Sequence, residues 1–156
     1  MESVKPEIKS GRYQRVHRQL SGLLSSPADP VAQMATMVAV LYHKFPYFFW
    51  CGFYCRRGTE LWVGPYQGNL ACMKLPENTG VCWAGINQER TLVVPDVHDF
   101  PGHIACDSRS RSEIVVPFRD QQAQIAGVLD VDGRSPGLFD EQDARGLELI
   151  LSLLVL

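Results

Sequence analysis

The chain has 156 residues, of which 46% are hydrophobic and 21% are charged, and its formal net charge at pH 7 is −2. This length predicts one domain whose core needs no disulfide framework, and the small net charge argues against a nucleic-acid or anionic-membrane surface. Residues 1–20 are polar, and no stretch reaches the roughly 20 apolar residues that span a bilayer. We therefore expect a cytoplasmic protein with no secretory signal.

Two helices are predicted in the N-terminal third of the chain. Residues 11–25 form an amphipathic pattern that includes Tyr13, Val16 and Leu20. Asp29-Pro30 then has the form of an N-cap followed by proline at the first helical position. From there, apolar residues recur at i, i+3, i+4 and i+7 spacing as far as Phe45. We expect this helical segment to cover about residues 11–46.

The middle of the chain is predicted to be mostly sheet. An aromatic strand and a second strand are separated by a turn and should form a hairpin, Phe48–Cys55 with Glu60–Tyr66. Two short extended pieces, at residues 73–75 and 91–94, flank a predicted helix at Gly80–Gln88. Two further strands follow a long polar segment, Glu113–Phe118 and Ile125–Asp132. Strands joined by short turns favour antiparallel pairing.

Asp140 is predicted to cap a final helix at about 140–156, which buries Leu147, Ile150, Leu151 and Leu154. The order of elements favours an α+β fold, with a mostly antiparallel sheet and the helices on one side. We expect a single domain over 1–156. Its sheet and active-site loops, at about 48–132, lie between N-terminal and C-terminal helices.

The five cysteines are more typical of buried, catalytic or metal-binding residues than of a disulfide framework, given the expected compartment. Cys51 and Cys55 have aromatic and apolar neighbours, which predicts buried, inert thiols. Cys72 lies in a predicted loop. Cys106 lies in the polar segment at residues 96–111, whose length predicts a functional loop.

Cys106 also has histidines nearby, so a metal site is an alternative interpretation. His98 and His103 precede it in the same segment. Their spacing matches no standard zinc pattern, and we expect no resident metal.

Three acidic residues could approach the same place as Cys106. In the strand at 125–132, alternation puts Asp130 and Asp132 on one face with Ala126 and Val128, and Ile125, Gly127, Leu129 and Val131 on the other. Glu113 begins the preceding strand. If these acids face solvent they form an ordinary strand end. If they face a pocket, like charges raise a pKa, and one carboxyl can keep a proton near neutral pH.

Several motifs together resemble the free methionine-(R)-sulfoxide reductases, which are single GAF-domain enzymes. The motifs are Trp-Cys-Gly-Phe-Tyr at 50–54, Gly-Pro-Tyr-Gln-Gly at 64–68, Ala-Cys at 71–72, Gly-Val-Cys at 80–82, Asp-Val-His at 96–98, Phe-Pro-Gly-His-Ile-Ala-Cys-Asp at 100–107, Ser-Glu-Ile-Val-Val-Pro at 112–117 and Gly-Val-Leu-Asp-Val-Asp at 127–132. The resemblance covers nearly the whole chain. It implies a GAF-like fold and reduction of free L-methionine-(R)-sulfoxide.

The resemblance also implies roles for individual residues. Cys106 would be the nucleophile that becomes a sulfenic acid, Cys72 the resolving residue and Cys82 a possible second resolving residue. The substrate site would consist of Trp50, Glu113, Asp130 and Asp132. No cofactor would be bound, and thioredoxin or a similar dithiol protein would restore the thiols of a homodimeric enzyme.

One departure from the family pattern is Trp83, which follows Cys82 where a small residue is common. A bulky side chain there could change how the Cys82 segment folds or moves. Two alternative functions stay open at this point. One is a non-catalytic GAF module that binds a small ligand, and the other is a thiol redox sensor that forms a disulfide without turnover.

Overall fold

A computed structural model describes residues 6–26, 29–103 and 105–156. Six strands form one sheet in the order β3-β2-β1-β6-β5-β4, and each neighbouring pair is antiparallel. The strands are β1 Trp50–Arg57, β2 Glu60–Gln67, β3 Lys74–Leu75, β4 Leu92–Val94, β5 Ser112–Arg119 and β6 Ile125–Gly133. The helices are α1 Pro6–Leu23, α2 Pro30–Lys44, α3 Gly80–Gln88 and α4 Glu141–Leu151, with a short 3-10 helix at Val97–Asp99.

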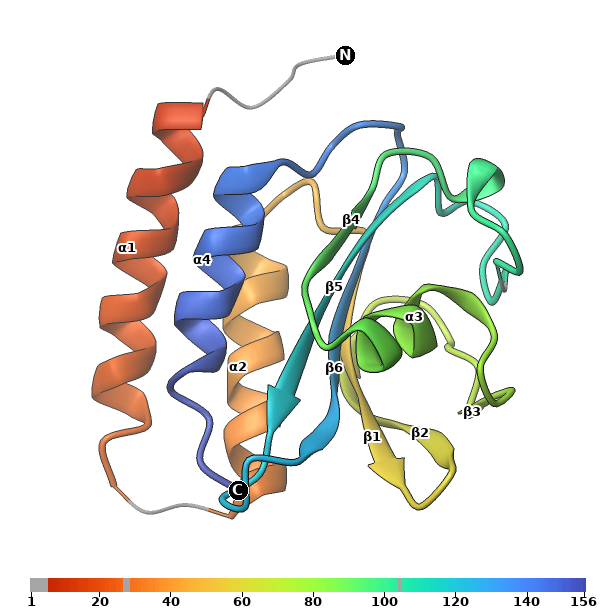
Figure 1. Cartoon of the computed structure of the whole chain (residues 1–156). Coiled ribbons are helices and arrows are strands. Elements are labelled where there is room, and N and C mark those ends of the chain that lie inside the picture. Colours follow the sequence, from red (N-terminus) through yellow and green to blue (C-terminus); the bar gives the residue numbers. More distant parts are fainter. Residues whose placement is uncertain (1–5, 27–28, 104) are drawn as a thin grey trace.

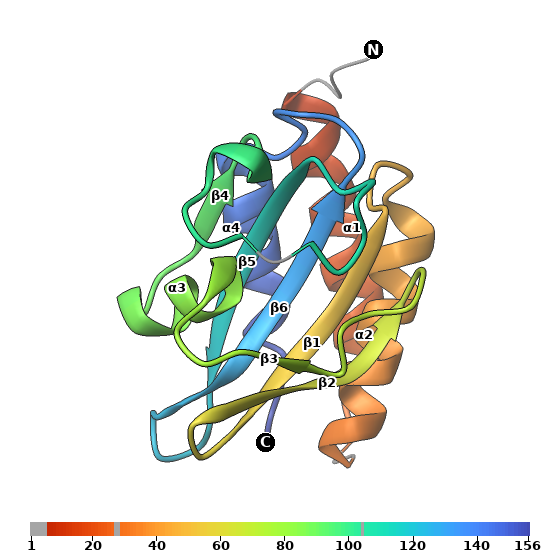
Figure 2. The ribbon, with the colours of Figure 1, turned by 90° about the vertical axis from the view of Figure 1, so that its right-hand side faces the viewer.

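The helices lie on both faces of the sheet. Helices α1, α2 and α4 cover one face, while α3 lies against the other face, over β5 and β6 (Figure 1 and Figure 2). The expectation that all helices lie on one side is therefore wrong for α3. A nine-residue apolar helix carries no sequence signal for the face it covers, and its position is fixed by packing against Val115 of β5.

The face covered by α1, α2 and α4 holds the larger core. Its fully buried side chains include Leu41 of α2, Phe53 of β1, Leu129 of β6 and Leu147 of α4. The N-cap prediction at Asp29 is confirmed, because its carboxylate accepts hydrogen bonds from the backbone N–H groups of the first turn of α2. Burial of these apolar residues is the main stabilising term of the domain.

A buried polar cluster joins both ends of the chain on this side. Lys9 Nζ donates to Asp143 at 2.6 Å and to Asp140 at 3.0 Å. The Tyr13 and Tyr47 hydroxyls also donate to Asp143, at 2.8 and 2.6 Å. Helix α1 consequently begins at Pro6 rather than near residue 11, because the turn that carries Lys9 packs on α4. Asp140 caps α4 as predicted, but this helix ends at Leu151, short of residue 156.

The alternation predicted along β6 is correct from residue 128 onward and wrong before it. Val128 belongs to the core under α3, whereas Leu129 and Val131 belong to the three-helix core. Ile125 packs in the core under α3, and Ala126 packs against the three-helix core, which is the reverse of the prediction. The cause is a bulge: Phe118 pairs with Gly127 and Arg119 with Ile125, which leaves Ala126 as an extra residue.

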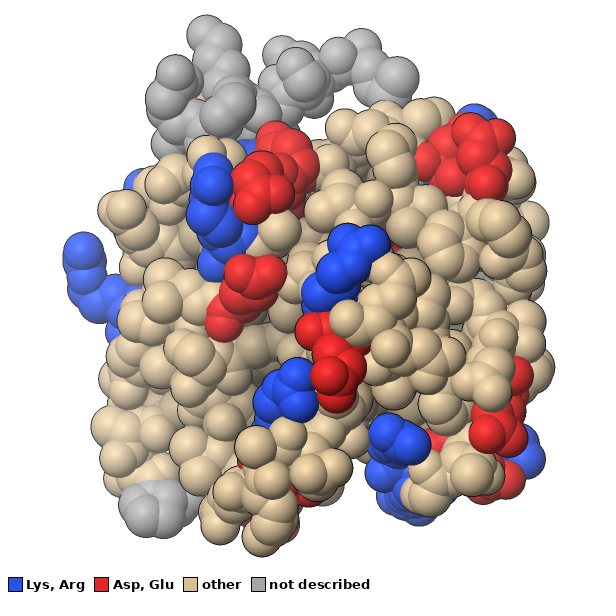
Figure 3. All heavy atoms as spheres, viewed as in Figure 1, with Lys and Arg blue, Asp and Glu red and all other residues tan. Residues whose placement is uncertain are grey.

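Charged side chains of both signs are interspersed on the face of the molecule that Figure 3 presents. This distribution agrees with the small net charge of the chain. None of the helices in the described ranges combines the length and the apolar character needed to cross a membrane.

Candidate active site

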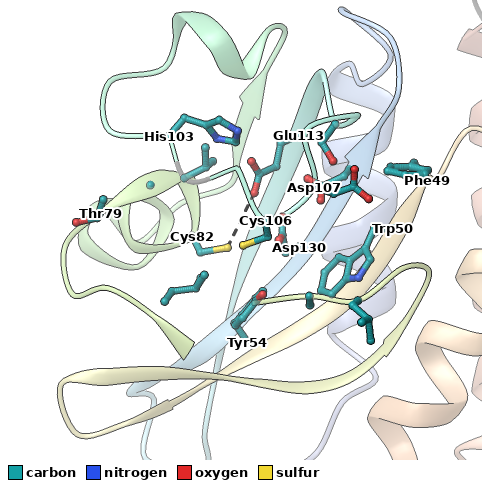
Figure 4. A pocket seen from close by; sticks show the side chains of 17 residues that line it. Phe49, Trp50, Tyr54, Thr79, Cys82, His103, Cys106, Asp107, Glu113 and Asp130 are labelled. Atoms are coloured by element: carbon teal, nitrogen blue, oxygen red, sulfur yellow. Dashed lines mark hydrogen bonds between the residues drawn. The ribbon is translucent and has the colours of Figure 1, made fainter. Parts of the chain in front are cut away.

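A pocket lies on the face of the sheet that carries α3. The first residues of α3, the pocket-side residues of β1, β5 and β6, and two loops line it (Figure 4). We call these the Cys72 loop, residues 68–73, and the Cys106 loop, residues 100–111. The predicted functional loop therefore contributes to the pocket. Its Ile104 lies outside the described residues.

A disulfide between Cys72 and Cys106 joins the two loops. Their Cα atoms are 5.5 Å apart, and 34 positions separate them in sequence. Cys106 is exposed and Cys72 is half-buried, so the disulfide lies at the mouth of the pocket within reach of solvent. The pairing implied by the family resemblance is thus present.

Hydrogen bonds hold the Cys72 loop against β1. The Tyr54 hydroxyl donates to the carbonyl of Cys72 at 2.8 Å, and Trp50 Nε1 donates to the carbonyl of Asn69 at 3.1 Å. The Asn69 side chain in turn donates to Asp107 at 3.4 Å, which ties this loop to the Cys106 loop. The position of Cys72 therefore depends on two aromatic residues of β1.

Trp50, the residue expected beside the substrate methyl group, forms one wall of the pocket. Its ring is buried and stacks on Tyr54 and Tyr66, with centroid distances of 6.0 and 5.3 Å. The indole lies directly over Gly52, where an added Cβ would come within 2.5 Å of it. Glycine at this position is what allows the aromatic wall to form.

Acidic residues form the floor of the pocket. Glu113 pairs with Asp132 across β5 and β6, and Asp130 lies two residues along β6 on the same face. Glu113 and Asp130 are buried, while Asp132 is partly exposed. Burial, followed by the charges of Asp130 and Asp132, raises the pKa of Glu113. Burial likewise raises the pKa of Asp130 and of Asp132.

Cys82 lies in the first turn of α3 and lines the pocket near Cys106 (Figure 4). It is buried, and its Sγ is 4.0 Å from Glu113 Oε1. Burial, followed by the charge of Asp130, raises the pKa of this thiol, so it is a weak nucleophile at neutral pH. The next residue, Trp83, packs into the core under α3. The bulky side chain therefore fixes the helix that carries Cys82.

Among the described residues, the potential metal ligands that converge are Cys82, Glu113 and Asp130. The set considered from sequence, His98 and His103 with Cys106, does not gather in this way. His103 lines the pocket, but Cys106 is held in the disulfide.

The other two cysteines lie away from the pocket. Cys51 is buried in the three-helix core, as predicted, whereas Cys55 is only half-buried and packs against the edge of that core near Met34. Sequence reasoning missed Tyr54 and Ser110, which both line the pocket. Tyr54 lies within one of the family motifs and four residues after Trp50, but a tyrosine in a strand is usually a packing residue. Ser110 carries no signal of its own.

Comparison with known proteins identifies relatives over almost the full length. The chain is 45% identical to GAF domain-containing protein A of Dictyostelium discoideum, covering 94% of this chain and 92% of that one. It is 36% identical to the free methionine-R-sulfoxide reductase of Escherichia coli, covering 94% and 88%. No protein-family model matches it.

Among solved structures, the free methionine-R-sulfoxide reductase of Neisseria meningitidis in complex with its substrate superposes with a TM-score of 0.88. The two sequences are 39% identical, and the match covers 99% of this chain and 90% of that one. The chain belongs to the free methionine-R-sulfoxide reductase family. It is therefore an enzyme homologue with the GAF fold that the resemblance implied.

Membership of the free methionine-R-sulfoxide reductase family gives the pocket a chemical context. Proteins of this family at this level of identity share the overall fold, but the roles of individual residues depend on local geometry. In this member, the disulfide, the acidic floor and the aromatic wall all border one pocket. The geometry is thus that of a thiol site next to buried acids and an apolar surface.

Proposed function

We propose that this protein reduces free L-methionine-(R)-sulfoxide to L-methionine, with Cys106 as nucleophile and Cys72 as resolving residue. The observation that carries the proposal is the Cys72–Cys106 disulfide at the mouth of a pocket whose floor is acidic. A thiol pair that oxidises beside a pocket with acidic and apolar walls is what this two-step reduction needs.

The proposed chemistry balances in three steps. The sulfoxide sulfur gains two electrons and methionine leaves, while the oxygen passes to Cys106, which becomes a sulfenic acid. Cys72 then attacks the Cys106 sulfur, the disulfide forms and water leaves. Thiol–disulfide exchange with an external dithiol, for which we propose thioredoxin or a similar protein, restores both thiols.

We assign the acidic residues to the substrate. Sulfoxide reduction needs a proton on the departing oxygen, and a buried carboxyl with a raised pKa can hold that proton at neutral pH. Glu113 is the first candidate for the proton donor, because burial and two neighbouring acids raise its pKa. Asp130 and Asp132 complete the polar side of the site, and they also suit the substrate ammonium group.

Trp50 is assigned to the methyl end of the substrate, because its buried ring presents an apolar wall to the pocket. Cys82 stays a second candidate for resolution. Its thiol is free and buried in α3, whereas Cys72 is bonded to Cys106, which favours Cys72 as the first resolving residue. Homodimerisation, which the family resemblance implies, and a cytoplasmic location, expected from the sequence, are further proposals.

Methionine release from separate R and S sulfoxides of free methionine, with dithiothreitol as reductant, tests this function. We expect turnover of the R isomer alone, and none in Cys106→Ser. The matched control is Cys55→Ser, which removes a half-buried thiol outside the pocket and should keep wild-type activity.

Failure to turn over either isomer would refute the proposed activity. The same protein would then be tested as a ligand-binding module or thiol sensor, the two alternatives that its fold and its disulfide allow. Turnover that persists in Cys106→Ser would instead refute the assignment of the nucleophile.

A further inference from the structure

Three potential metal ligands meet at one point on the floor of the pocket. One ligand atom from each of Cys82, Glu113 and Asp130 lies within 4.8 Å of the other two. Figure 4 shows Cys82 directed at Glu113, with a dashed line between them. The three residues come from α3, β5 and β6, so packed secondary structure holds them rather than a loop.

The polar groups at this point are buried, and one of their oxygen atoms has no partner in the protein. The three side chains are buried, with exposed fractions of 4%, 6% and 6% for Cys82, Glu113 and Asp130. The Asp130 side chain shares hydrogen bonds with Glu113 and Cys82, but its Oδ1 has no hydrogen-bond partner. No lysine or arginine occurs among the described residues that line the pocket. Buried carboxylate oxygens normally have partners, and a bound cation would supply the missing one.

We propose that Cys82, Glu113 and Asp130 form a binding site for one thiophilic divalent cation of the Zn²⁺ class. Zinc–ligand bonds of about 2.3 Å to sulfur and about 2.0–2.2 Å to oxygen place tetrahedral ligand atoms about 3.3–3.7 Å apart. The 4.0 Å between Cys82 Sγ and Glu113 Oε1 is close to that range, and the other two distances are at most 4.8 Å, so side-chain rotations would have to draw the three ligand atoms together.

The donor set selects the kind of metal. Thiolate ligands favour Zn²⁺ and softer ions over Mg²⁺ and Ca²⁺, which prefer oxygen ligands only. Three protein ligands leave one position of a tetrahedral ion directed to the open pocket, where water or a small ligand can bind. The site therefore resembles an exchangeable zinc site more than a closed structural one.

Occupancy of this site has a consequence for the reaction, and this consequence rests on the proposed function. The cation and the substrate would use the same acids, Glu113 and Asp130. Bound Zn²⁺ should therefore inhibit the enzyme reversibly and in competition with methionine sulfoxide.

Cobalt(II), a coloured substitute for zinc, tests the binding itself. The oxidised protein is used, because its disulfide removes Cys72 and Cys106 as ligands. We expect one equivalent to bind, with the sulfur-to-cobalt charge-transfer absorption of a thiolate ligand. Cys82→Ser should abolish that absorption, whereas the control Cys55→Ser should keep it. Asp130→Asn retains the thiol, so it should keep the absorption but weaken Zn²⁺ binding by about 10–100-fold in competition with a chromophoric chelator.

Absence of the absorption in the wild type, or its persistence in Cys82→Ser, would overturn the metal site. A circular dichroism spectrum of each variant separates loss of a ligand from loss of the fold. Zn²⁺ affinity that is equal in the wild type, Cys82→Ser and Asp130→Asn would overturn it as well.

Single-turnover methionine release tests the inhibition. The protein is reduced beforehand and freed of dithiothreitol, which itself binds zinc. Zn²⁺ should slow the release and a chelator should restore it, and the slowing should be weaker in Cys82→Ser, which keeps Cys72 and Cys106 as possible ligands in the reduced protein. Binding without inhibition would overturn the inhibitory role. If the metal-free protein releases no methionine, the proposed reductase function fails, while the cobalt titration still decides the metal site.

Discussion

Glu113 and Asp132 lie directly opposite each other on adjacent antiparallel strands, so a buried carboxyl faces a second acid across the sheet. Like charges in this arrangement destabilise a strand pair. Asp130 adds a third acid on the same face. The strands that carry the proposed site therefore hold residues that favour chemistry at the expense of stability.

Replacing Glu113 by glutamine should make the domain more stable and less active. The change keeps the shape of the side chain but removes a carboxyl that loses its proton in the unfolded chain and keeps it when buried, and we expect a gain of about 1 kcal/mol in the free energy of unfolding at pH 8. Urea unfolding of the oxidised protein measures this, together with methionine release. Glu77→Gln, at an exposed loop position, is the control and should change neither quantity. A less stable Glu113→Gln protein would contradict this account of the site.

The stability difference between Glu113→Gln and wild type should depend on pH. Because the folded protein raises the pKa of Glu113, the native state holds a proton that the unfolded chain releases above about pH 4.5. Wild-type stability should therefore fall as pH rises from that value through the folded pKa. The stability of the glutamine variant should fall less over the same range. The difference in free energy of unfolding between Glu113→Gln and wild type should therefore grow with pH and be smallest near pH 4. A constant difference at all pH values would mean that Glu113 has an ordinary pKa.

Cys72→Ser should separate the two halves of the proposed cycle. Without the resolving thiol, each protein can still release one methionine, so the single-turnover rate should stay near the wild-type value. Multiple turnover with a protein dithiol should fall by about tenfold or more, because the sulfenic acid on Cys106 is no longer converted to a disulfide. Rapid-quench measurement of methionine gives both rates. Equal loss of both would rule out Cys72 as the resolving residue.

Gly52→Ala should damage the aromatic wall without touching any polar group. The added methyl group would lie 2.4 Å from Tyr66 Cβ and 2.5 Å from the Trp50 ring. Displacement of Trp50 should lower kcat/KM for methionine sulfoxide by about 10–100-fold, and tryptophan fluorescence should report the movement. Gly22→Ala in α1, where no atom lies within 4 Å of the new Cβ, is the matched control. Normal kcat/KM in Gly52→Ala would exclude Trp50 from the substrate site.

Asp143→Ala should destabilise the domain strongly while leaving the chemistry of the folded protein intact. It leaves the buried Lys9 ammonium without its 2.6 Å partner, and it removes the acceptor for the hydroxyls of Tyr13 and Tyr47. We expect a loss of about 3–5 kcal/mol in the free energy of unfolding. Breaking the exposed pair of Arg145 and Glu141 should cost less than about 1 kcal/mol, which provides the comparison. Urea midpoints of the two variants check this ordering.

Local signals in the sequence predicted the helices and strands well. The Asp29-Pro30 cap, the Gly80–Gln88 helix and the strands around Glu113 and Asp130 all depend on neighbouring residues, which a single sequence displays. The start of α1 was missed because it depends on the ion pair of Lys9 with Asp143, whose partners are far apart in sequence.

The site was predicted less completely from chemistry alone. The acids and Cys106 could be singled out by residue type, but their convergence on one pocket rested on the family resemblance. Tyr54 was missed because its role is to donate a hydrogen bond to the carbonyl of Cys72, a backbone contact that no side-chain pattern reveals. The side of the sheet on which α3 lies was also not encoded in any local pattern.

The sheet divides the apolar interior into two separate cores, one beneath the three long helices and one beneath α3. The pocket is built only from the second side, where a single nine-residue helix and two loops cover the strands. Mutations in α3 or in these two loops can reshape the pocket without changing the larger core under α1, α2 and α4. Ligand preference in such a domain can therefore diverge during evolution while the capacity to fold is inherited unchanged.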